Sequence, residues 1–262
     1  MDLKIENLTK SYNGKTVLKS VNLEVKSSTC LGIMGESGSG KSTLGRLVVG
    51  LEKPDGGQIY FDGKTVKDRT RLERRQLRKK VQVVFQNAYG AVNPNFTMRM
   101  VMEEPFKFMD QKLDKKDQEE KIRKTLDQVG LGHLNLDENA RRLSGGQVQR
   151  LCIARALIQE PEILLLDEAL SGLDYLVQKQ LLQLLAHIKE RHNLSYLFIV
   201  HDFLLAYGLC DQVIIMDQGE IVDRLDIQEG HEIKKPTHPM SVKLLGDFFK
   251  QGRDSNSKWY LI

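Results

Sequence analysis

A glycine-rich segment between two apolar stretches has the residue types and spacing that bind phosphate. It reads Gly35, Glu36, Ser37, Gly38, Ser39, Gly40, Lys41, Ser42 and Thr43. Two glycines flank four residues and Lys-Ser follows, which is the pattern of a phosphate-binding loop. Glycines let backbone N–H groups turn toward phosphate oxygens, and a helix N-terminus adds partial positive charge. In such a loop Lys41 reaches the β- and γ-phosphates, and the Ser42 hydroxyl ligates Mg²⁺.

The elements around this loop give the motif its meaning. Residues 30–34 form an apolar run that predicts a buried parallel strand, and residues 43–49 have the pattern of a helix. A strand, a loop and a helix in this order form the context that phosphate binding requires. The alternative is a glycine-rich turn without a ligand, and it loses weight as the rest of the chain is considered.

Three further polar side chains follow predicted buried strands. Residues 163–166 lead to Asp167 and Glu168, and residues 194–200 lead to His201. Open α/β sheets bind ligands at the carboxyl ends of their parallel strands. Asp167 is placed there to hold Mg²⁺, directly or through water, and Glu168 to polarise an attacking water as general base. The alternative for His201 is a hydrogen-bonded core histidine, but the same sheet edge already carries the phosphate loop and the acidic pair.

A second glycine-rich segment precedes residues 148–158, which are apolar on one face and predict a helix. Its residues are Leu143, Ser144, Gly145, Gly146 and Gln147. Backbone N–H groups and a serine hydroxyl at a helix N-terminus form a second place that could meet an anion.

The remaining segments predict a sheet, an insertion and a basic surface. Residues 3–8 and 17–25 alternate as antiparallel strands, and Tyr12 between them is either a half-buried strand-end residue or a ring that stacks on a base. A strand over 81–86 ends at Gln86. Helical, polar segments over 97–134 predict an inserted subdomain. The basic run over 67–80 favours a solvated helix face, with a surface near anionic lipids as the alternative.

Bulk properties restrict the class of protein. A length of 262 residues suits one large domain or a core with an insertion, and a net charge of +4 gives no argument for a nucleic-acid partner. Cys30, Cys152 and Cys210 lack metal-ligand spacing, which predicts buried, reduced thiols in a cytosolic compartment. No run of about 18 apolar residues occurs, so we expect another chain to provide any membrane-spanning part.

Together these motifs resemble the nucleotide-binding subunit of an ABC (ATP-binding cassette) transporter, over residues 3–245. Leu143 to Gln147 match the family's signature, which is highly specific in this order and position. Matches to single positions complete the resemblance: Gln86 to the Q-loop, Asp167 to the Walker B acid, Glu168 to the catalytic glutamate, Asp174 to the D-loop, His201 to the switch histidine and Tyr12 to the adenine-stacking aromatic residue.

The resemblance implies the fold: an α/β protein with a P-loop NTPase (RecA-like) core, an antiparallel β subdomain and an inserted helical subdomain. We expect the ATPase domain over residues 1–245, the helical subdomain over about 87–160 and a short C-terminal tail over 246–262. It also implies ATP as substrate and Mg²⁺ as cofactor, held by Ser42, Gln86 and Asp167. His201 is expected to contact the γ-phosphate.

The resemblance further implies partners. Two ATPase subunits pair head to tail, so that ATP lies between the phosphate loop of one and the signature of the other. A heterodimer is favoured, with a homodimer left open. Transmembrane permease subunits, and through them an extracytoplasmic solute-binding protein, would place the chain at the cytoplasmic face of the membrane as a peripheral subunit.

Residues 84–94 and 236–245 resemble the oligopeptide, dipeptide and nickel importers, and the early end of the chain tilts toward nickel or another metal chelate. Two dipeptides depart from the usual pattern. Ala169-Leu170 stand where the family usually has Pro-Thr, and Asn87-Ala88 where this group has Asp-Pro. The alternatives are a soluble ABC ATPase in a non-transport complex, such as one for phosphonate breakdown, and a regulatory binding module without turnover.

Overall fold

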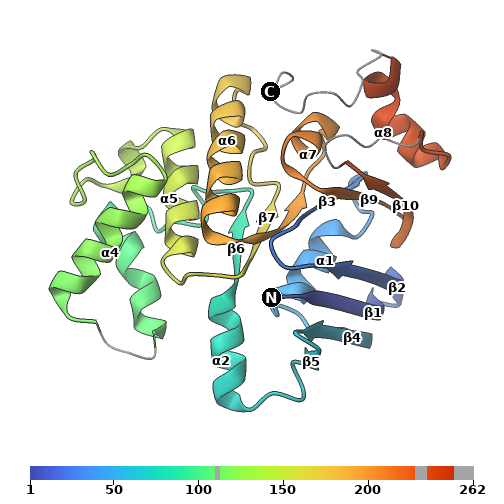
Figure 1. Ribbon diagram of the computed structural model, residues 1–262, viewed down its shortest axis with the longest axis horizontal. Helices are drawn as coiled ribbons and strands as arrows, with labels where there is room; N and C mark the ends of the chain where they lie inside the picture. Colours follow the sequence, from blue (N-terminus) through green and yellow to red (C-terminus); the bar gives the residue numbers. More distant parts are fainter. Residues whose placement is uncertain (110–112, 228–234, 251–262) are drawn as a thin grey trace.

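The molecule contains two β-sheets: the larger one runs through its middle, with most of the helices around it, and the smaller one lies at the lower right in Figure 1. The computed structural model describes residues 1–109, 113–227 and 235–250. Helix α1 (Lys41–Val48) lies between the sheets, and its buried Leu44 belongs to the same apolar cluster as Leu3 of one sheet and Ile33 of the other. The phosphate-loop segment therefore lies where the two sheets share a core.

The larger sheet has six strands in the order β10-β9-β3-β8-β7-β6, all parallel except β10. Its strands are β3 (Cys30–Gly35), β6 (Val81–Phe85), β7 (Ile163–Asp167), β8 (Ser195–Ile199), β9 (Gln212–Asp217) and β10 (Glu220–Asp226). The central strands β3 and β8 are buried along their whole length, as their continuous apolar runs require in a sheet covered on both faces. All the strands predicted from apolar runs are present.

The smaller sheet has four antiparallel strands in the order β2-β1-β4-β5. They are β1 (Leu3–Tyr12), β2 (Lys15–Val25), β4 (Gly56–Phe61) and β5 (Lys64–Thr65). Burial alternates along β1 and β2 in keeping with their alternating sequence, so one face packs on the core while the other faces solvent. Both β1 and β2 are longer than predicted, because β1 continues to Tyr12 and β2 begins at Lys15, on either side of the turn that connects them.

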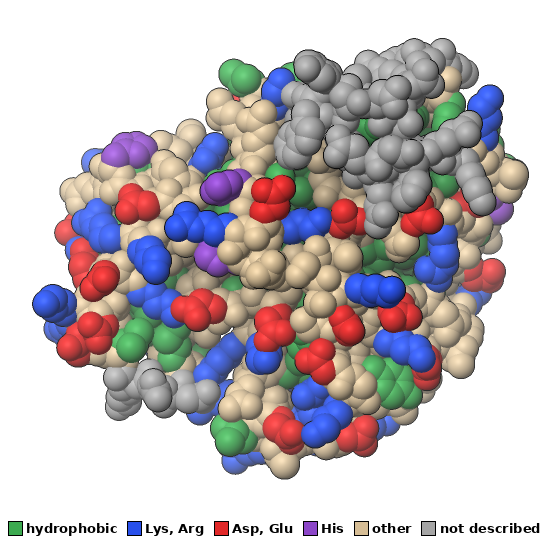
Figure 2. Space-filling model, in the orientation of Figure 1, with side chains coloured by type: hydrophobic (Ala, Val, Ile, Leu, Met, Phe, Trp, Pro, Cys, Tyr) green, Lys and Arg blue, Asp and Glu red, His purple; other side chains and the backbone are tan. Residues whose placement is uncertain are grey.

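The helices of the core flank the larger sheet (Figure 1). They are α2 (Arg71–Lys80), α6 (Tyr175–His192), α7 (Phe203–Leu209) and α8 (Pro239–Lys250). Only Leu77 of α2 is buried, so the basic run forms a largely solvated helix face. Acidic and basic side chains are interspersed over the face seen in Figure 2, in agreement with the small net charge.

A helical part packs beside β6 and β7. It contains α3 (Met98–Glu103), the 3-10 helix η1 (Glu104–Phe108), α4 (Lys115–Gln128), the 3-10 turn η2 (Ala140–Arg142) and α5 (Gly145–Leu157). The prediction of helix through residue 134 was wrong, because the chain leaves α4 at Gln128 and Gly130 adopts a left-handed φ of 74°. The limits of the inserted subdomain, about 87–160, stay a prediction.

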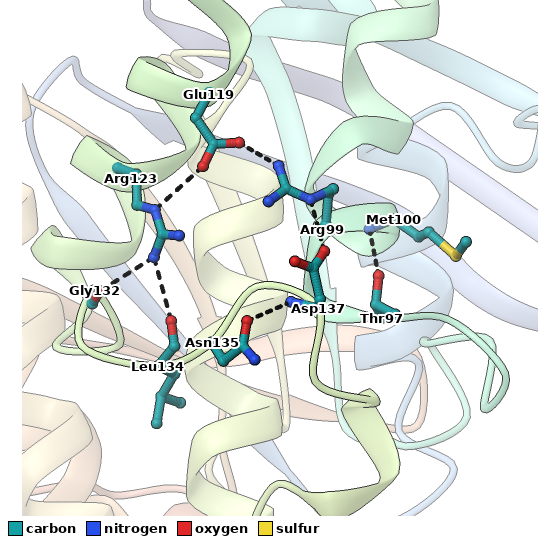
Figure 3. Close-up of polar contacts among 9 residues, drawn as sticks. All are labelled: Thr97, Arg99, Met100, Glu119, Arg123, Gly132, Leu134, Asn135 and Asp137. Atoms are coloured by element: carbon teal, nitrogen blue, oxygen red, sulfur yellow. Dashed lines mark hydrogen bonds and ion pairs between the residues drawn. The ribbon is translucent and has the colours of Figure 1, made fainter. Parts of the chain in front are cut away.

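An ion-pair network holds the helical part together (Figure 3). Arg99 of α3 pairs with Glu119 of α4 and donates to Asp137 Oδ1 at 2.9 Å. Arg123 pairs with the same Glu119 at 3.4 Å and donates to the Leu134 carbonyl oxygen at 3.2 Å. The network thus connects α3, α4 and the loop that leads toward α5.

Helix α8 continues to Lys250, and residues 251–262 of the predicted C-terminal tail lie outside the described residues. Cys30, Cys152 and Cys210 are buried thiols, as predicted. The fold also brings the Cys30 and Cys210 sulfurs to within 3.1 Å of each other. In the described part of the chain, no helix has the length and apolar character that crossing a bilayer demands.

Candidate functional site

The phosphate-loop segment connects β3 to α1 at the carboxyl edge of the larger sheet. Gly40 precedes α1 with a φ of 105°, and a Cβ there would lie 2.7 Å from Leu18 Cδ2. A Cβ on Gly35 would lie 2.3 Å from the Met216 carbonyl oxygen. Glycine is therefore required at both ends of the loop by close packing and, at Gly40, by backbone conformation.

Lys41 is buried at the first position of α1, with 4% of its surface exposed. Its ammonium donates to the carbonyl oxygens of Gly35 at 2.9 Å and Glu36 at 2.8 Å. Burial lowers the pKa of Lys41, and the nearby carboxylates of Glu168 and Asp167 oppose that shift. The loop therefore holds a cation at its centre, although a bound phosphate would have to compete with the two carbonyl oxygens for it.

Ser42 and Asp167 meet where α1 faces the end of β7. The Ser42 hydroxyl donates to Asp167 Oδ1 at 3.3 Å. Burial raises the pKa of Asp167, and the hydrogen bond from Ser42 opposes the increase. Beside them, the buried hydroxyl of Ser39 lacks a hydrogen-bond partner within the described structure. Such an orphaned polar group in a loop of this shape is an observation that favours a polar ligand.

The same pair of oxygens fits Mg²⁺. This ion prefers oxygen ligands and is usually bound through one or two carboxylates together with water and substrate phosphates. Ser42 supplies a hydroxyl and Asp167 a carboxylate. Among the described residues, no group of three or more His, Cys, Asp and Glu side chains could hold a metal ion unaided. The residues present therefore suit an ion that arrives with a phosphate ligand.

Glu168 and His201 form a hydrogen-bonded pair just beyond the ends of β7 and β8. His201 Nε2 and Glu168 Oε1 lie 2.6 Å apart. Glu168 adopts a φ of 51°, which is uncommon for a residue with a side chain, and its N–H donates to the Ile199 carbonyl oxygen at 3.0 Å. The neighbouring strand thus helps to keep the carboxylate in an unusual conformation at the edge of the site.

Gln86 leaves the sheet next to the acidic pair. Phe85, the last residue of β6, is in register with Asp167, so Gln86 follows the end of the strand adjacent to β7. The Gln86 side chain is exposed. The structure thus brings Lys41, Ser42, Asp167, Glu168, His201 and Gln86 to one sheet edge.

The signature segment, Leu143 to Gln147, lies at the start of α5, and its polar side chains form hydrogen bonds within the segment. Ser144 is the N-cap: its Oγ accepts from the Gln147 N–H at 3.3 Å, and Gln147 Oε1 accepts from the Ser144 N–H at 2.9 Å. Asp174 similarly caps α6 by accepting from the Val177 N–H at 3.0 Å. In the described part of the chain, no hydrogen bond or ion pair joins Ser144, Gly145, Gly146 or Gln147 to the phosphate loop.

Tyr12 ends β1, with 38% of its surface exposed. Its hydroxyl donates to Glu52, whose other carboxylate oxygen accepts from Arg46 Nε at 2.7 Å. Sequence reasoning missed both partners. Glu52 follows α1 in a loop and lies 40 residues from Tyr12, so no local pattern connects them.

Comparison with known proteins gives one family. A family model described as "ABC transporter" matches residues 18–171. The nickel import ATP-binding protein NikE of Rhodospirillum rubrum is 40% identical over 222 residues, which cover 85% of this chain and 80% of that protein. NikE of Escherichia coli strain K12 is 41% identical over 216 residues, covering 81% of this chain and 80% of that protein.

Solved structures agree in fold. A dimeric ATP-binding cassette in a post-hydrolysis state, bound to ADP and Pi, has a TM-score of 0.77 at 30% identity and covers 86% of this chain and 99% of its own. The cbiO1 protein of Clostridium perfringens, part of the ABC transporter complex cbiONQ, has a TM-score of 0.76 at 30% identity. That alignment covers 85% of this chain and 87% of cbiO1.

Proposed function

This chain belongs to the ABC transporter family, and from that membership we propose that it is the ATP-hydrolysing subunit of a nickel importer. The proposal that nickel is the transported solute rests on the 40% identity to a nickel import ATP-binding protein across 85% of this chain. The relatives favour nickel over a peptide cargo, and transport over a role in phosphonate breakdown. The intact pair Glu168 and His201 argues against a binding module without turnover.

The residues at the carboxyl edge of the larger sheet support the proposal that this chain binds ATP. The loop N–H groups and Lys41 would hold the phosphates, and Tyr12 would stack on the base. Ser42, Asp167 and Gln86 are proposed to hold Mg²⁺, which when bound neutralises charge on the β- and γ-phosphates. The half-buried Asp167 carboxylate, whose pKa burial raises, then gains a cation as its partner.

The hydrolytic roles follow from the pair at the strand ends. We propose that Glu168 accepts a proton from the attacking water and that His201 donates a hydrogen bond to the γ-phosphate. In the present structure these two side chains bond to each other at 2.6 Å. That contact keeps Glu168 aimed at His201, so engagement of the phosphate by His201 would free the carboxylate to face water.

The partners extend the family assignment. We propose a head-to-tail pair of ATPase subunits in which Ser144, Gly145, Gly146 and Gln147 meet the ATP of the other subunit, with Asp174 at the approach. The exposed N-terminus of α5 is consistent with a ligand that another chain presents. A heterodimer, two permease subunits and an extracytoplasmic solute-binding protein complete the proposed complex at the cytoplasmic face of the membrane.

Affinity purification of the chain from gently solubilised native cells tests the complex. Permeases and a second ATPase among the co-purifying proteins would support transport, whereas a soluble complex without membrane subunits would overturn it.

Uptake of radioactive nickel in cells that lack this chain tests whether nickel is the cargo. Restoration of uptake by the wild-type chain but not by the Glu168→Gln variant is expected, and nickel uptake that does not depend on the chain would refute the cargo.

A further inference from the structure

A continuous line of polar side chains connects the Tyr12 ring to the phosphate loop. The Tyr12 hydroxyl donates to one carboxylate oxygen of Glu52, and Arg46 Nε donates to the other at 2.7 Å. Arg46 Nη2 lies in turn 3.3 Å from the Thr43 hydroxyl, which belongs to the phosphate loop. The far ends of this line are the two places where a nucleotide's base and its phosphates are proposed to bind.

Glu52 is fixed from several sides. Its backbone N–H and that of Leu51 both donate to the Arg46 carbonyl oxygen, at 3.4 Å and 2.9 Å, so the loop turns tightly at the end of α1. Its side chain is 26% exposed. The hydrogen bond from Tyr12 lowers the pKa of Glu52, with Arg46 contributing in the same direction against burial, so the carboxylate stays ionised near neutral pH.

The Tyr12 ring is also held by a cation. Lys10 Nζ lies 5.3 Å from the ring centroid and is itself fixed by Asp55 Oδ1 at 3.1 Å and the Lys53 carbonyl oxygen at 2.9 Å. A ring held in place before a ligand arrives loses less conformational entropy on stacking than a ring that rotates freely. The contacts around Tyr12 therefore suit a preorganised platform more than a mobile surface tyrosine.

We propose that Glu52 is a positioning residue, which ties the Tyr12 ring to α1 through Arg46 and thereby sets the preference for a triphosphate with a base over the bare triphosphate. This inference rests on the proposed stacking role of Tyr12. Glu52 itself needs no contact with the nucleotide. It acts through the hydroxyl of Tyr12 and through the helix that follows the phosphate loop.

Equilibrium binding by the full chain, with MgATP and with magnesium tripolyphosphate as separate ligands, tests the proposal. The quantity of interest is the ratio of the two affinities, because tripolyphosphate has no base to stack. Base–aromatic stacking corresponds to about five- to hundredfold in affinity. Glu52→Ala should lower the ratio by about fivefold or more, while tripolyphosphate binding, which reports an intact phosphate loop, stays as in the wild type.

Matched variants separate positioning from simple loss of structure. Tyr12→Phe keeps the ring without the hydroxyl and should lower the ratio as Glu52→Ala does, and the double variant should add nothing further. Glu52→Gln keeps an oxygen acceptor and should recover most of the ratio. Glu6→Ala removes an exposed ion pair with Lys4 on the same strand as Tyr12 and should leave the ratio unchanged.

Three outcomes would overturn the inference. If Glu52→Ala weakens both ligands equally, Glu52 supports the phosphate loop and not the base platform. If Tyr12→Ala lowers the ratio but Glu52→Ala does not, stacking by Tyr12 stands and positioning by Glu52 fails. If Tyr12→Ala itself leaves the ratio unchanged, the stacking role of Tyr12 fails and the inference fails with it.

Discussion

The phosphate loop and the signature segment both lie at glycine-rich helix N-termini, but the polar groups of the two segments are hydrogen-bonded to different extents within the chain. Gly40, the N-cap of α1, has no side-chain cap. The loop before it holds a buried ammonium and a buried hydroxyl that has no hydrogen-bond partner among the residues described. Ser144, the N-cap of α5, forms a reciprocal capping box with Gln147. One helix start therefore keeps a polar group that a ligand could satisfy, whereas the other is satisfied as a helix cap.

This difference separates two tasks. A loop with a buried cation and a carboxylate–hydroxyl pair can bind a phosphate and its metal ion without help. A capped, exposed helix start offers only its remaining N–H groups, so it can contribute once another surface presents the anion. The contrast therefore fits a composite site, in which one segment binds the ligand and the other recognises the bound ligand from outside.

Removal of the proposed general base, Glu168, should give the largest effect, and this effect should be confined to the site around the phosphate loop. Glu168→Gln keeps the side-chain shape but cannot take a proton from water. We expect ATP hydrolysis to fall by about 10²- to 10⁴-fold, because a general base contributes that much. ATP binding and ATP-dependent dimerisation should be retained. Steady-state turnover with size-exclusion chromatography in the presence of ATP measures both, and turnover near the wild-type value would remove Glu168 from its role.

Removal of the buried Lys41 cation should strongly weaken ATP binding. Lys41→Ala deletes an ammonium that lies among loop carbonyl oxygens and near two carboxylates. Loss of a desolvated, hydrogen-bonded charge should weaken ATP binding by about thirtyfold or more. Calorimetric titration measures the affinity. Lys19→Ala is the matched control, because Lys19 of β2 loses only an exposed ion pair with Glu220 of β10. Equal affinity in the two variants would refute the loop assignment.

The parts of this site that sequence could predict are those encoded locally. The spacing of Gly35, Gly40 and Lys41 predicts a loop, and apolar runs that end at Asp167 and His201 predict strands whose ends meet. Parallel pairing then brings these ends together, because Asp167 and Ile199 are in register. Local chemistry indicated that Ser144 could meet an anion. The family resemblance added that this anion is the ATP of another subunit, and it alone supplied the role of Gln86.

The parts that sequence could not predict depend on contacts between distant segments. Glu52 and Arg46 reach Tyr12 only because the loop after α1 folds back toward the end of β1. Cys30 and Cys210 were treated as unrelated thiols, although pairing of β3 with β9 brings their sulfurs together. The early end of α4 is different, because the sequence did contain a signal for it: Gly130 and Gly132 follow Gln128 closely, and Gly130 takes the left-handed conformation that ends the helix.

The signature segment should respond to substitution only when two subunits meet. Ser144→Ala removes the cap of α5 and the hydroxyl that would face the partner's ATP. We expect about 1 kcal/mol of stability to be lost with the cap. ATP affinity of the isolated subunit should be unchanged, and hydrolysis should fall by about tenfold, as for loss of a hydrogen-bonded contact in the composite site. Binding and turnover measured on the same preparation separate the two effects.

A second helix cap provides the control for Ser144. Asp114 caps α4 by accepting from the Asp117 N–H at 2.8 Å, on an element that carries none of the proposed site residues. Asp114→Ala should therefore cost similar stability and leave hydrolysis intact. A comparable fall in hydrolysis in Asp114→Ala would attribute the Ser144 effect to instability of the helical part, and the proposed difference between the two helix starts would then lose its support.

The smallest effect should come from Asp167, the carboxylate that is proposed to bind the metal ion. Burial raises the pKa of Asp167 above its ordinary 3.8, so the folded protein binds this proton more tightly than the unfolded chain does. The associated stability is present below about pH 4 and is lost as pH rises through the folded pKa. Asp167→Asn stays neutral and still accepts from Ser42. Without nucleotide it should be more stable than the wild type at pH 7, by less than about 1 kcal/mol because the group is partly solvated.

Urea denaturation between pH 4 and 8 measures this effect, and Ser42→Ala sharpens it. The Ser42 hydroxyl lowers the pKa of Asp167, so its removal should extend the pH-dependent loss of stability to higher pH. A stability difference between Asp167→Asn and the wild type that does not change with pH would contradict the assignment to this carboxylate. With MgATP present the order should reverse, because the charge that costs stability in the empty site is the one that the metal ion requires.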